Sequence, residues 1–134
     1  MNKTIEKENI KCNNIFKILK GIILSVLITL LGLLILAIVI TYTNVSESII
    51  PIAVTIITAI SILIGSFFST INIQKNGLLN GFAVGFAYIA TIYIISSITS
   101  TGFTLTNTSF IMIISAILAG MLGGIIGVNL KNKK

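Results

Sequence analysis

The chain has 134 residues, of which 55% are hydrophobic and only 9% are charged. A soluble domain carries roughly 25% charged residues, so this composition excludes an ordinary water-soluble globular protein. The formal net charge of +6 comes from lysines without arginine, which disfavours nucleic-acid binding, because that function calls for a basic face with arginines and stacking aromatic rings.

Four apolar stretches follow a polar tail. Residues 1–15 have mixed charge and few apolar positions, so we expect this tail to be irregular or to lie at the membrane surface. A helix needs about 20 apolar residues to cross about 30 Å of hydrocarbon. The expected transmembrane helices cover residues 18–40, 49–70, 77–98 and 109–130. Pro51 fits the first turn of the second helix, and Ser46 or Ser48 is its expected cap.

The lysines predict the orientation of these helices. Cytoplasmic loops are enriched in lysine and arginine. The only charge in the two loops that lack lysine is Glu47. All lysines fall on one side of an even number of spans: Lys3, Lys7, Lys11, Lys17, Lys20, Lys75, Lys131, Lys133 and Lys134. We therefore expect one all-α domain over residues 1–134, an up-down-up-down bundle in the bacterial plasma membrane with both termini cytosolic, whose lysines contact anionic lipid headgroups.

Small residues recur at helical spacing in the last two spans. The third-span row consists of Gly77, Gly81 and Gly85. The fourth-span row consists of Ala116, Gly120 and Gly124, and the side row of Gly123 and Gly127. Spacing of four residues places each row along one ridge, where a neighbouring backbone can approach closely. Of the eleven glycines, only Gly32 and Gly102 lie outside the half of the spans nearest the lysines. This distribution predicts tight packing at that end, within the chain or against another copy.

Groups that carry most membrane chemistry are absent from the spans. Proton-coupled small multidrug exporters are four-span proteins of similar length, but they depend on a membrane glutamate that has no counterpart here. Gly81, Phe82 and Gly85 weakly resemble the third span of small fluoride channels, but this chain lacks the arginine motif that those channels have in the first span. With no histidine and one cysteine, the chain cannot build a typical transition-metal site, so we expect no catalytic residue, metal or cofactor. Asn80 is the most polar side chain within a span, a candidate for a buried polar contact.

Two segments carry a family resemblance. KNGLLNGFAVGFAY begins the third span and AGMLGGIIGVNLKNKK ends the chain. With these segments, the chain resembles the YrzE-like membrane proteins of low-GC Gram-positive bacteria, a family of unknown function that implies a location and no site residues.

The functional hypothesis is an accessory or structural membrane protein, not an enzyme, that associates with itself or with another membrane protein through the rows. The alternative is a minimal channel, carrier or holin-like pore former. A water-filled path would let polar thiol reagents reach cysteines placed at Thr55, Thr91 and Ser96, whereas an association module would protect them.

Overall fold

The computed structural model describes residues 2–71, 73, 76–99 and 106–133, which are helical apart from short connections. The four long helices are α1 (Asn2–Tyr42), α2 (Ile50–Thr70), α3 (Gly77–Thr99) and α4 (Asn107–Asn132). Each is long and apolar enough to cross a membrane, and the described residues include no strand. The all-α class is confirmed, and the chain is a multi-pass membrane protein. Three of the helices enclose their expected spans, and α2 begins one residue after the expected start at 49. The depth at which the bilayer meets each helix stays a prediction.

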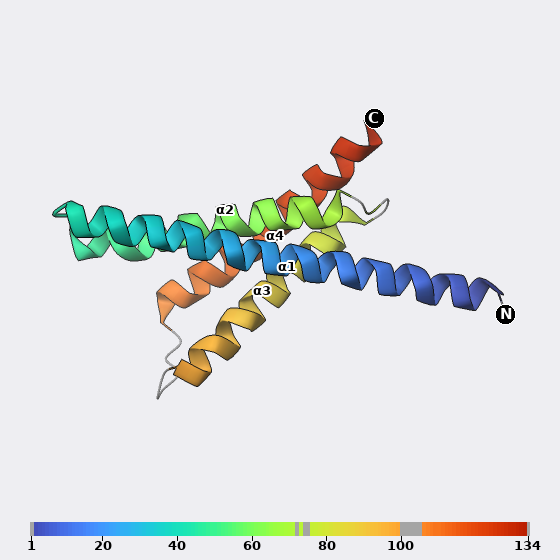
Figure 1. Ribbon diagram of the computed structural model, residues 1–134, viewed down its shortest axis with the longest axis horizontal. Coiled ribbons are helices and arrows are strands. Elements are labelled where there is room, and N and C mark those ends of the chain that lie inside the picture. Colours follow the sequence, from blue (N-terminus) through green and yellow to red (C-terminus); the bar gives the residue numbers. More distant parts are fainter. Residues whose placement is uncertain (1, 72, 74–75, 100–105, 134) are drawn as a thin grey trace.

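The polar tail is the main departure from the expected local structure. Residues 2–15 continue α1 instead of forming an irregular segment, so α1 has 41 residues. At 1.5 Å per residue such a helix is about 60 Å long, roughly twice the hydrocarbon thickness. No glycine or proline interrupts the helix before Gly21, and lysine–glutamate pairs three residues apart support its first turns. Figure 1 shows this part of α1 projecting beyond the other helices.

The start of α2 differs from the expected capped helix. A 3-10 turn, η1 (Glu47–Ile49), precedes α2. Pro51 lies in the first turn of α2, as predicted. The expected serine cap is wrong, because neither serine bonds to the helix backbone through its side chain. The hydroxyl groups of Ser46 and Ser48 instead bond to each other at 3.0 Å. A proline without an N–H leaves one fewer donor for a cap to satisfy.

The helices form two crossing pairs (Figure 1). α1 runs antiparallel to α2, since Gly21 lies against Ser69 and Gly32 against Ile57. α3 runs antiparallel to α4 in the same way, and α4 also packs against α2. α2 therefore lies at the centre and contacts all three other long helices, whereas α1 and α4 share no close backbone contact in the described part of the chain.

Among the described residues, burial is confined to one half of the molecule. We call the end with Lys17, Lys20 and Lys131 the lysine end, and the opposite end, with residues 43–49, the far end. Buried residues in the four long helices lie only at 21–29, 61–70, 77–88 and 116–127. Tight packing therefore coincides with the glycine-rich half, as the glycine distribution predicted. Towards the far end every residue from 92 to 99 is exposed.

Candidate functional site

The third-span row lies directly against the fourth-span row within one chain. A Cβ added to Gly81 would overlap the carbonyl oxygen of Gly120 and lie 2.9 Å from Cα of Gly124. A Cβ on Gly85 would lie 2.8 Å from the carbonyl oxygen of Ala116, and one on Gly77 would lie 2.6 Å from a methyl group of Val128. Backbone therefore meets backbone along the whole row, as small residues allow in membrane helices.

The side row faces α2. A Cβ on Gly127 would lie 2.7 Å from the carbonyl oxygen of Phe67, and one on Gly123 would overlap that of Leu63. The hydroxyl group of Ser66 donates a hydrogen bond of 2.6 Å to the carbonyl oxygen of Gly120. α4 is thus held on two sides, by α3 through one row and by α2 through the other.

A further contact of the same kind joins α1 to α2. Ser25 and Gly21 lie against Gly65, and a Cβ on Gly21 would lie 2.5 Å from Cβ of Ser69. The hydroxyl group of Ser69 donates a bond of 3.0 Å to the carbonyl oxygen of Lys17. Together with the contacts of α4, these small residues account for the close approach of all the helices at the lysine end.

A buried hydroxyl cluster joins α1, α2 and α3 near the middle of the spans. The hydroxyl group of Tyr88 donates a hydrogen bond of 2.9 Å to that of Thr29, which itself donates to the carbonyl oxygen of Ser25 at 2.7 Å. The side chain of Thr58 on α2 lies close to the Tyr88 hydroxyl group. Only 2% of Tyr88 and 6% of Thr29 are exposed. Sequence analysis missed this cluster, although Ser25 and Thr29 at a spacing of four residues were a usable signal.

The remaining predicted polar groups lie apart from this cluster. Asn80 is half-buried one turn inside α3, and its backbone N–H bonds to the carbonyl oxygen of Asn76 at 3.0 Å. Asn76 has a φ of 60°, a left-handed conformation that asparagine tolerates at such a turn. Cys12 is exposed. Lys75, Gly102 and Lys134, which the sequence arguments used, lie outside the described residues.

This arrangement satisfies the buried polar groups and packs the helices closely. Among the described residues, every buried side-chain nitrogen or oxygen has a hydrogen-bond partner, and no three His, Cys, Asp or Glu side chains gather where they could bind a metal ion. The rows are buried at each of their glycines. A second chain has no room at Gly81 or Gly124, because each already faces the backbone of the neighbouring helix.

Comparison with known proteins places the chain in one family. A family model described as "Protein of unknown function (DUF3792)" matches residues 14–127. This range includes α2 and α3 in full, most of α1 and α4, and all the rows. No curated protein and no solved structure matches the chain.

Proposed function

The chain belongs to the DUF3792 family of proteins of unknown function, and from this premise we propose that it is a non-enzymatic accessory or structural protein of the bacterial plasma membrane. It associates with a second copy or with another membrane protein. Its four helices cross the membrane up-down-up-down with both termini in the cytosol, in line with the lysines at one end. The low-GC Gram-positive, YrzE-like assignment belongs to the same proposal.

The exposed far end of α3 is the observation that supports association. Residues 92–99 form more than two helical turns without a buried position on any side. Ile98 is 82% exposed and Ile94 is 58% exposed. Lipid can cover such a surface, but a helix that leaves its own bundle also offers a complete face to another helix.

The association surface therefore differs from the one expected from sequence. The rows were the expected surface, but their glycines face α2, α3 and α4 of the same chain. Packing of the rows holds the lysine end together and leaves the far ends of the two helix pairs apart (Figure 1). We place the partner contact on the far end of α3.

Photocrosslinking in native membranes tests this surface. A photoreactive residue replaces Ile98, and a matched control replaces Leu31, a leucine of α1 that is 55% exposed. We expect protein adducts from position 98 and almost none from position 31. Self-adducts identify an oligomer, and adducts to one other protein identify an accessory subunit. Equal adduct yields at both positions, or none at either, contradict the proposal.

One observation favours the alternative function, a minimal channel, carrier or pore former. The buried pair of hydroxyl groups on Thr29 and Tyr88 lies where burial ends and the far halves of the helices begin. Polar groups at mid-depth are where a pathway would contact a solute. Cysteines at Thr91 and Ser96 that react rapidly with charged thiol reagents in intact cells would favour this alternative, and protected cysteines would favour association.

A further inference from the structure

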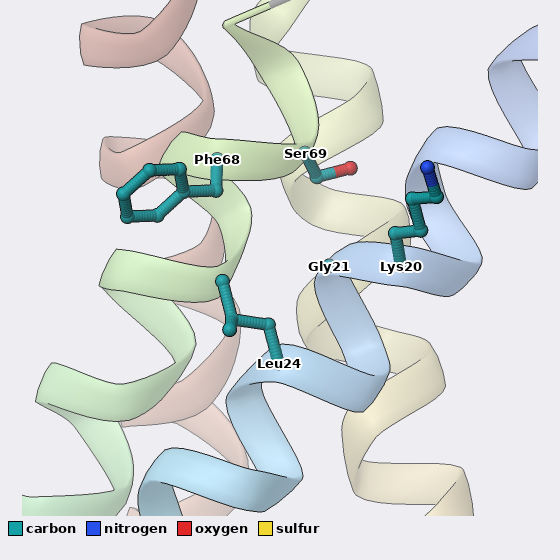
Figure 2. A pocket seen from close by; sticks show the side chains of 5 residues that line it. All are labelled: Lys20, Gly21, Leu24, Phe68 and Ser69. Carbon is teal, nitrogen blue, oxygen red and sulfur yellow. The ribbon is translucent and has the colours of Figure 1, made fainter.

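A shallow groove lies between α1 and α2 at the lysine end. Its volume is about 270 Å³, and it is lined by Lys20, Gly21 and Leu24 of α1 and by Phe68 and Ser69 of α2. In Figure 2 the hydroxyl group of Ser69 points towards the side on which the Lys20 side chain extends, above Gly21 and Leu24. The groove thus combines one ammonium group with an apolar wall.

Two small residues explain why the surface is hollow there. Gly21 and Ser69 form the contact between the helices, and a Cβ on Gly21 would already lie 2.5 Å from Cβ of Ser69. Larger side chains lie beside this contact, among them Phe68, which is 55% exposed. The hydroxyl group of Ser69 already donates to the carbonyl oxygen of Lys17. The floor of the groove at Gly21 and Ser69 is therefore polar, and its hydroxyl group already has a hydrogen-bond partner. The wall at Phe68 is apolar.

The depth of the groove follows from the sequence around it. Lys20 is the last charged residue before the uncharged part of α1, and Ser69 lies next to the last residue of α2. Both therefore lie at the boundary between polar headgroups and hydrocarbon, where the stem of a lysine lies along apolar surface and its ammonium reaches the headgroups.

The chain places no acidic side chain near this ammonium group. The three acidic residues are Glu6, Glu8 and Glu47. Glu8 is twelve residues before Lys20 on the same helix, which is about 18 Å at 1.5 Å per residue. Glu47 is at the far end. No glutamate of the chain is therefore a partner for the Lys20 ammonium group.

We propose that this groove binds one anionic phospholipid, with the phosphate at the Lys20 ammonium group and an acyl chain along Leu24 and Phe68. A zwitterionic lipid fits the apolar wall equally well but brings no net negative charge to the lysine end. One lysine near an anionic membrane surface favours the anionic lipid about fivefold. The site does not depend on the association proposed above, because it is complete within one chain and lies at the other end.

Fluorescence quenching by brominated lipids measures this preference directly. The chain contains no tryptophan, so Phe68→Trp introduces a single reporter in the groove. The variant is reconstituted in vesicles of phosphatidylcholine and phosphatidylglycerol in which one or the other lipid is brominated. We expect phosphatidylglycerol to be favoured about fivefold next to this reporter, and Lys20→Gln in the same background to bring the ratio close to one.

Two controls separate the groove from general attraction of anionic lipid. Phe86→Trp places the reporter on α3 at a residue that is 60% exposed, and we expect no preference there. Lys131→Gln removes one charge from the lysine end but outside the groove, and should leave the preference at Phe68→Trp unchanged. Equal preference at both reporters, or an unchanged ratio after Lys20→Gln, would overturn the proposal.

A second measurement covers the case in which the reporter variant does not fold. Native mass spectrometry of the wild-type chain in detergent should show one retained phosphatidylglycerol, lost in Lys20→Gln and kept in Lys131→Gln. Addition of soluble glycerol phosphate should not displace it, because the acyl chain contributes to binding. Displacement by glycerol phosphate would assign the groove to a soluble anion and contradict the lipid proposal, as would equal retention in both variants.

Discussion

Gly81→Ala should destabilise the protein more than any other single methyl group added to the third-span row. The new Cβ would overlap the carbonyl oxygen of Gly120 and lie 2.9 Å from Cα of Gly124. Both neighbours are backbone atoms of α4 and cannot rotate away, so the two helices must move apart. Overpacking of this kind costs about 1–3 kcal/mol. The higher helix propensity of alanine offsets about 0.5–1 kcal/mol. We expect a net loss of about 1 kcal/mol, and at most about 2.5 kcal/mol, in the free energy of unfolding.

Gly32→Ala is the matched control for this prediction. A Cβ at Gly32 would meet only the side chain of Ile57, at 2.5 Å from Cγ2 and 3.9 Å from Cβ, and no backbone atom of the neighbouring helix. Isoleucine is stiff at χ1 in a helix, so Gly32→Ala should also cost some stability, but less than Gly81→Ala, which has the same gain in helix propensity. The assay is an SDS titration in mixed micelles, followed by the near-ultraviolet circular dichroism of the buried Tyr88. Equal stability of the two variants would refute the argument that the third-span row is in backbone contact.

Three further predictions concern the hydroxyl groups and the orientation. Tyr88→Phe should lower the free energy of unfolding by about 0.6 kcal/mol and by no more than about 2, a typical range for interhelical hydrogen bonds. A double variant with Thr29→Val should be non-additive, and both are measured by resistance to proteolysis across the SDS titration, because Tyr88→Phe removes the tyrosine signal. Ser66→Ala should cost a similar amount, because it removes a bond of 2.6 Å to α4; no loss of stability would argue against this bond. Cys12, which is exposed, should react with a membrane-impermeant maleimide only in inside-out vesicles. A cysteine at Ser48 should react in intact cells. The reverse pattern would contradict the proposed orientation.

The helices of the chain could be predicted from the sequence without knowledge of the tertiary structure. The length of each apolar stretch predicted the four long helices, because a backbone in hydrocarbon must satisfy its own hydrogen bonds. Pro51 was placed correctly because its missing N–H suits a first turn. The helical structure of the tail before Phe16 was not predicted, because its polar sequence indicated that it would not be buried. A helix that continues from a stable transmembrane helix does not need burial of its own.

The sequence by itself determined that this is an all-α, multi-pass membrane protein, and which helical faces are lined with small residues. Only the tertiary structure decided what those faces meet. Spacing of four residues shows that Gly77, Gly81 and Gly85 share a ridge, but the same ridge could pack against another copy or within the chain. Tyr88 and Thr29 are 59 residues apart and meet only through helix packing. The groove beside Lys20 likewise exists only where two helices touch. A periodic pattern encodes the direction of a side chain around its own helix axis, and the identity of the neighbour depends on how the four axes cross.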